Sequence, residues 1–278
     1  MTAAGELAAA LRRTRRYLPM ASASLHTLLQ YRISLLTGVS STAVSTTVQL
    51  FLWRAIYAGA PGRTLGGMTR DQMATYILVS NLLVMLLANR VEDEVSGEIY
   101  RGDIAVNLVR PLSYPLLRFF ACLPVVGTNA VLAGLPLAAL LVAVPGLAGP
   151  GPADAALFVA AAVFSVLIGF AVNFLVGMTG FVTVNTWGIR YVKGSVVAFF
   201  SGQVVPIALM PAGLAAVARA LPFQSMVGAP ARLFLGQYDD RRDALWILGQ
   251  QALWAVALLA LSALLWRRAV GRLEVLGG

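Results

Sequence analysis

The sequence predicts an all-α polytopic membrane protein. Three observations support this: an apolar composition, six long apolar stretches and an uneven distribution of basic residues. Hydrophobic residues make up 59% of the 278 residues, charged residues make up only 12%, and the mean hydropathy is +0.78. Soluble domains carry roughly 25% charged residues. A chain this apolar has too little polar surface to cover a soluble fold, so we expect it in a bilayer.

Six apolar stretches are long enough to cross a bilayer as helices, because about 20 apolar residues span the roughly 30 Å hydrocarbon layer. They cover residues 33–56, 73–90, 117–144, 155–184, 194–218 and 244–266. We therefore expect a single transmembrane domain over residues 1–278. Its membrane region is 33–266, between an N-terminal segment at 1–32 and a tail at 267–278.

Basic residues are concentrated on one side of these stretches, which predicts the orientation of the chain. The N-terminal segment, the loops after the second and fourth stretches and the tail hold most of them. The loop between the third and fourth stretches holds none. Because arginine and lysine favour the cytoplasmic ends of membrane helices, we expect both termini to be cytoplasmic.

Two segments differ from simple spans. Residues 5–18 place leucines on one helical face and arginines elsewhere, which is typical of an interfacial helix on the anionic cytoplasmic leaflet. A disordered basic tail is the alternative for these residues. In the fifth stretch, Pro206 and Pro211 interrupt the helix. We expect the residues after them to turn back as a re-entrant outer segment before the last helix.

The composition excludes several kinds of chemistry. One cysteine and one histidine exclude a disulfide framework and a metal site with several such ligands. The single lysine, Lys193, does not stand in the G-x-x-x-x-G-K-[ST] pattern of P-loop ATPases. No ionisable residue lies near the middle of a stretch, which argues against a proton-driven carrier and an intramembrane enzyme. We expect no catalytic residue, metal, cofactor or nucleic-acid partner, and we assign the net charge of +9 to membrane orientation.

Uncharged polar residues are scarce within the stretches and fall into two groups. Gln49, Asn81 and Gln203 are amides at membrane depth. Such amides either line a translocation path or hydrogen-bond neighbouring helices, and we expect these three to line a path. The second group recurs every fourth residue in the fourth stretch, and its small side chains favour close helix packing. Its members are Ser165, Gly169, Asn173 and Gly177.

The loop at 92–112 combines dense charge with an ordered apolar pattern. Val91, Val95 and Ile99 recur every four residues, so a short helix would present an apolar ridge between acidic flanks. Gly102 is a natural end for this helix. An ordered ridge favours a helix that docks into a cytoplasmic partner, and an ordinary interfacial helix is the alternative.

The same loop resembles a known family. Its runs E-I-Y-R-G-D-I-A at 98–105 and L-V-R-P-L-S-Y at 108–114 are similar to a segment of ABC-2 type exporter permeases. The similarity is to the subgroup whose ATPase is a separate polypeptide. The runs at 52–57, which closes the first stretch, and 221–236, which precedes the last, resemble the same subgroup.

The resemblance implies six spans, a cytoplasmic N-terminal connecting helix, a coupling helix in the 92–112 loop and short re-entrant helices before the last span. It also implies two cytoplasmic ABC ATPase subunits and a second permease, either a copy or a relative, in a bacterial cytoplasmic membrane. The residues that we assign to coupling are Val95, Glu98, Ile99, Arg101, Gly102, Asp103, Leu108, Arg110 and Pro111.

From these observations we expect the permease subunit of an ATP-driven transporter that works by alternating access. The uncharged spans favour export of an amphiphilic or apolar substrate over a free ion. A stand-alone channel or an ion-coupled secondary carrier is the alternative, and a membrane scaffold without transport is a third hypothesis. Co-purification of an ATPase would discriminate among the three.

Overall fold

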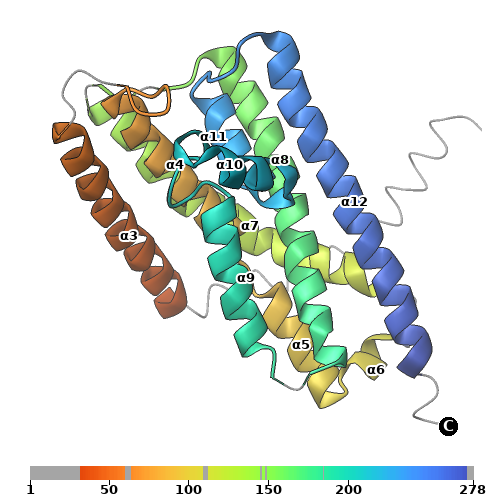
Figure 1. Cartoon of the computed structure of the whole chain (residues 1–278). Coiled ribbons are helices and arrows are strands. Elements are labelled where there is room, and N and C mark those ends of the chain that lie inside the picture. Colours follow the sequence, from red (N-terminus) through yellow and green to blue (C-terminus); the bar gives the residue numbers. More distant parts are fainter. Residues whose placement is uncertain are drawn as a thin grey trace, which may run out of the picture.

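The computed structural model describes residues 32–59, 64–108, 112–144, 146–147, 149–183 and 185–273, and these are mostly helical (Figure 1). Within these ranges the β-pairing is limited to one isolated bridge, between Leu65 and Met68. The expected all-α class is therefore confirmed. The interfacial helix expected at 5–18 lies outside the described residues.

Five long helices and several short ones make up the described chain. The long helices are α3 (Arg32–Ala58), α4 (Arg70–Leu87), α7 (Tyr114–Ala143), α8 (Pro152–Gly177) and α12 (Arg241–Leu273). The short α-helices are α5 (Val91–Arg101), α6 (Ile104–Leu108), α9 (Trp187–Phe200), α10 (Ala212–Ala220) and α11 (Gly228–Phe234). Three 3-10 turns are η1 (Met178–Phe181), η2 (Ile207–Leu209) and η3 (Pro222–Ser225).

Four helical segments of the described ranges are long and apolar enough to cross a membrane. They are Arg70–Arg101, which joins α4 and α5, Tyr114–Ala143, Pro152–Phe181 and Arg241–Gly271. The expected span at 33–56 corresponds to α3, whose 27 residues measure about 40 Å at 1.5 Å per residue. α3 contains several serines and threonines and is not one of those four segments.

The expected span at 194–218 is divided in the structure. Its helical part, α9, has 14 residues and ends at Phe200, ahead of Gly202, which has φ of +84°. Pro206 and Pro211 then stand at the N-caps of η2 and α10. The helix thus ends six residues before Pro206, the first of the two prolines expected to interrupt it, and neither proline lies inside a helix, where its missing amide hydrogen would be needed.

Helix α8 packs closely on its neighbours through its small residues. A Cβ atom added to Gly177 would lie 2.8 Å from Cβ of Val95 on α5, and one on Gly169 would lie 3.0 Å from a methyl group of Leu87 on α4. The Ser165 hydroxyl donates to the carbonyl of Ser225 in η3, at 3.2 Å. These close approaches are the ones that small residues permit in membrane helices.

Amide side chains fasten other parts of the bundle. Asn129 on α7 donates to the carbonyl oxygens of Met85 and Ala88, both at 2.9 Å, and so satisfies the end of α4. The buried Gln251 on α12 donates to the Ser225 carbonyl at 2.7 Å. These bonds fix α4 to α7 and η3 to α12.

The helices α3 and α9 lie at the periphery. α3 stands beside α4 (Figure 1). It buries Trp53 and Tyr57, whereas Val44, Val48, Phe51, Leu52 and Ile56 are exposed. α9 has no buried residue. In a membrane such faces are covered by lipid or by another membrane protein.

The contact between α5 and α8 predicts a stability difference between two glycine substitutions. Gly177→Ala should lower the free energy of unfolding by about 1–3 kcal/mol, because its Cβ overlaps Val95. On α7, a Cβ added to Gly134 would meet no neighbouring side chain or other helix within 4 Å. Gly134→Ala should therefore be neutral or raise the free energy of unfolding by up to about 1 kcal/mol. Thermal melting of the purified protein measures both. Adding Val95→Ala to Gly177→Ala should restore part of the loss, and equal melting of the two glycine variants would contradict the contact.

Candidate functional site

The expected coupling loop forms α5 and α6 at one end of the bundle, near the C-terminal end of α12 (Figure 1). Glu92, Asp93 and Glu94 occupy the first turn of α5, where acidic side chains stabilise the positive end of the helix dipole. Gly102 ends the helix with φ of 78°, a left-handed conformation that glycine adopts without strain. The expected helix and its end are thus both present.

The apolar ridge of α5 faces the protein itself rather than a partner. Val91 and Val95 are 1% and 0% exposed, and they belong to a buried cluster that includes Phe174 of α8. Ile99 packs against the same cluster and is half-buried. The sequence pattern indicated an apolar face correctly, but the chain's own α8 covers it. Val95 therefore has no surface left for a second protein.

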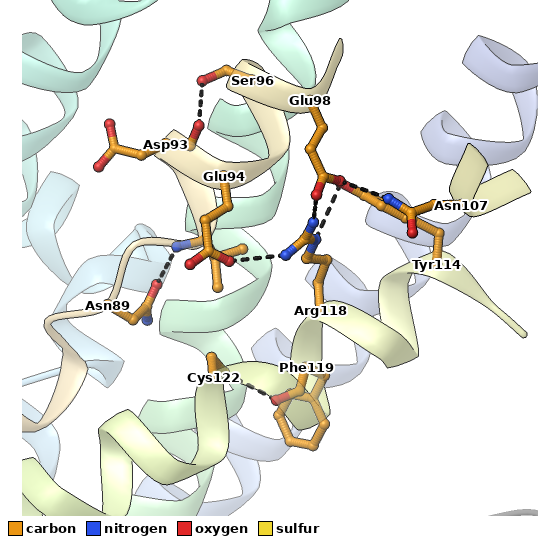
Figure 2. A network of polar contacts seen from close by, with 11 residues as sticks. Asn89, Asp93, Glu94, Ser96, Glu98, Asn107, Tyr114, Arg118, Phe119 and Cys122 are labelled. Atoms are coloured by element: carbon orange, nitrogen blue, oxygen red, sulfur yellow. Dashed lines mark hydrogen bonds and ion pairs between the residues drawn. The ribbon is translucent and has the colours of Figure 1, made fainter. Parts of the chain in front are cut away.

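On one side, α5 is tied to α6 and α7 by a partly buried polar cluster (Figure 2). The Arg118 guanidinium of α7 pairs with Glu94 at 3.0 Å and with Glu98, and its side chain is 12% exposed. Glu98 also accepts hydrogen bonds from the Tyr114 hydroxyl, at 2.7 Å, and from the Asn107 amide of α6, at 3.1 Å. Glu98 thus connects α5, α6 and α7.

On the other side, α5 is tied to α9 and α8. Arg190 of α9 pairs with Asp93, and Lys193 pairs with Glu92 at 2.7 Å. Lys193 also donates to Oδ1 of Asn173 on α8, at 2.9 Å. The Asn173 amide in turn donates to Asn89, at 3.1 Å, just ahead of α5.

The outward surface of this end carries apolar and charged residues. Tyr100 and Val106 are 66% and 64% exposed, and Leu108 is 36% exposed. Arg101 and Asp103 form an exposed ion pair at 2.8 Å. We call Tyr100, Arg101, Asp103, Val106 and Leu108 the end patch. Arg110 and Pro111, also assigned to coupling, lie outside the described residues.

The structure brings together two of the three amides that we expected to line a path. The Asn81 amide of α4 donates to the Gln49 side chain of α3 at 3.1 Å and to the Ile77 carbonyl at 2.9 Å. Gln203 is half-buried beyond α9, where its backbone amide donates to the Ser201 hydroxyl at 3.3 Å. The first pair links α3 to α4.

The charged residues of the α5–α6 end join α5 to neighbouring helices. All four acidic residues of α5 pair with a basic residue of another helix. They are Glu92, Asp93, Glu94 and Glu98. No group of three or more potential metal ligands occurs in the part of the chain that the structure describes. The acidic residues of α5 thus connect it to α7 and α9, and its apolar residues connect it to α8.

The long apolar helices define a multi-pass membrane protein. A model of the ABC-2 family of transporter proteins matches residues 43–277, and the chain belongs to that family. The resemblance seen in the sequence is thereby confirmed. Members of the family are membrane components that associate with ABC ATPases and are not themselves ATPases. The comparison with curated proteins gives no match.

Sequence reasoning missed the basic partners of α5. In the sequence, Arg118, Arg190 and Lys193 count toward the basic residues that predict membrane orientation, and the pattern assigns no acidic partner to any of them. The available signal was charge complementarity, because the acidic helix and these three basic residues were all assigned to the same side of the membrane. The sequence alone does not say which acid meets which base.

The two kinds of ion pair at this end should differ in their effect on stability. Arg118→Gln leaves Glu98, whose side chain is 16% exposed, without its cationic partner. Breaking a fully buried pair costs about 3–5 kcal/mol. Because the second carboxylate, Glu94, is half-exposed and remains hydrated without its partner, we expect Arg118→Gln to lower the free energy of unfolding by about 2 kcal/mol. Arg101→Gln removes an exposed pair and should change stability by less than about 0.5 kcal/mol. Unfolding of both variants, followed by thermal melting, tests this order, and an equal loss would contradict it.

Proposed function

We propose that this chain is the permease subunit of an ATP-driven exporter in a bacterial cytoplasmic membrane. Its single domain crosses the membrane six times, and both termini are cytoplasmic. The two further spans are α3 and the segment that begins with α9 and continues through η2. Two such permeases, identical or related, assemble with two ATPase subunits. The membership in the ABC-2 family and the excess of basic residues at the α5–α6 end support this proposal.

The observation that carries the proposal is the construction of α5. Its end patch is open to a partner, whereas its opposite face is packed on α8 and its flanks are paired with α7 and α9. A solvated loop has no need of such connections. A helix that receives a push from an ATPase needs all of them, because each connection transmits displacement to a membrane helix.

In this mechanism, ATP binding closes the two ATPase subunits and pushes on the end patch. α5 and α6 then displace the membrane helices, and a cavity between the two permeases changes from inward-facing to outward-facing. The substrate is amphiphilic or apolar, because the middles of the spans carry no charge to compensate a free ion.

The end patch provides the direct test of ATPase docking. Val106→Asp places a charge in the proposed contact, so the amount of ABC ATPase that co-purifies with the full chain should fall at least tenfold, whereas Val106→Ala should retain it. Thermal melting of both variants checks that the exposed site is neutral for folding. If Val106→Asp holds as much ATPase as the parent, the patch is not the docking surface. If the parent binds no ABC ATPase, a stand-alone channel or carrier replaces the proposal.

We also propose that Gln49, Asn81 and Gln203 line the translocation path. Gln49→Leu should change which amphiphilic dyes and lipids stimulate ATP hydrolysis by the complex, with little change in melting. Asn129→Leu is the matched control, because Asn129 holds the end of α4 and should lower melting without altering the substrate profile. If Gln49→Leu instead melts early and keeps the parent profile, the Gln49–Asn81 bond serves packing alone.

A further inference from the structure

Helix α9 is attached to the rest of the described chain by ion pairs in its first half and by the junction that follows its C-terminal end. None of its 14 residues is fully buried, and its apolar packing includes the partly buried Val197 and Phe200, which contact core clusters near its C-terminal end. Exposed apolar side chains, among them Tyr191 and Val192, cover much of its surface. A helix with this little packing follows the few contacts that fix it.

At the α5 end, these contacts are two ion pairs and one hydrogen bond, which the hydroxyl of Thr186, the N-cap of α9, donates to the Ser96 hydroxyl of α5 at 3.3 Å. Lys193 and Glu92 have side chains that are 20% and 15% exposed, so solvent screens their attraction less than that of a surface pair. Arg190 adds a second pair, with Asp93. The other charged groups of this part of α5 face α7, where Glu94 and Glu98 meet Arg118. Two adjacent acidic residues of α5 therefore hold α9, and the next two hold α7.

At the other end, α9 terminates in a tightly built backbone junction. The Tyr76 hydroxyl of α4 donates to the Gly202 carbonyl at 2.9 Å. A Cβ on Gly202 would lie 2.8 Å from that hydroxyl, and one on Gly228 would lie 2.8 Å from the Ser201 carbonyl oxygen. Ser201 itself is fully buried. This junction has no room to translate, but its glycine backbone can accommodate a change of helix direction.

We propose that Arg190 and Lys193 are positioning residues that carry the movement of α5 into α9, which then tilts about the Ser201–Gly202 junction. This inference rests on the proposed function and extends it, because it names the charged connection through which ATP-driven movement reaches α9. The apolar contacts of α5 transmit movement to α8, and these ion pairs transmit it to α9.

The test measures the position of α9 in the full complex with its ATPase, reconstituted in lipid nanodiscs. Cys122 is replaced by serine, and spin labels are attached at Ser195→Cys on α9 and Val256→Cys on α12, both exposed positions. Pulsed electron paramagnetic resonance compares the distance between the labels without nucleotide and with ATP and vanadate. In the parent, ATP should shift this distance.

Three variants assign the shift to the ion pairs. Glu92→Gln with Lys193→Gln replaces the pair by neutral amides and leaves no lone charge, and it should reduce the ATP-dependent shift by more than half. Adding Arg190→Gln to this variant should abolish the ATP-dependent shift. The charge exchange Glu92→Lys with Lys193→Glu, made in the parent, should give the parent's shift. Glu94→Gln is the matched control, because it removes a carboxylate of the same helix that faces α7, and it should retain the shift.

The outcomes separate this inference from the proposed function. If the neutral pair shifts as much as the parent, if the charge exchange does not restore the shift, or if Glu94→Gln loses it equally, α9 does not follow these pairs and the inference is overturned. ATP hydrolysis by the bound ATPase is measured in each complex, so such results leave the proposed function intact. If no ABC ATPase binds the parent chain, the proposed function fails and this inference fails with it.

Discussion

The packing of Val95 against Gly177 is the contact on which the α5–α6 end depends. Because Gly177 has no side chain, α5 approaches α8 closely enough for Val91 and Val95 to be covered. That approach also brings the acidic residues on the flanks of α5 within reach of bases on α7 and α9. A larger residue at position 177 would move the helix and all of these charges together.

The charges around α5 show why a short acidic helix is stable at the end of an apolar bundle. Four carboxylates on an 11-residue helix would repel one another if they were left alone. Each of them instead faces an arginine or the lysine of another helix. Separating the partners of these ion pairs costs free energy, so α5 moves more easily together with its neighbours than away from them.

The sequence predicts the class and most helix positions of this fold because long apolar stretches and glycine or proline breaks are local signals. The helix at 91–101 and its end at Gly102 followed from such a pattern. The destination of its apolar face did not, because periodicity shows that a face is apolar but not what covers it. The prolines predicted an interruption of 194–218, but the end of the helix at Phe200, before them, depends on how the following chain packs. The pairing of Lys193 with Glu92 depends on the folded arrangement of α5, α8 and α9.

The order of the helices along the chain has a consequence for membrane insertion. α5 is synthesised before α7 and α8, yet its apolar ridge is covered by α8. Val91 and Val95 therefore gain their α8 neighbours only after the later end of α8 has been synthesised. Arg118 is made earlier, so its pairing with Glu94 and Glu98 needs only α7. In the order of synthesis, the electrostatic attachment of α5 to α7 thus becomes available before its apolar packing on α8.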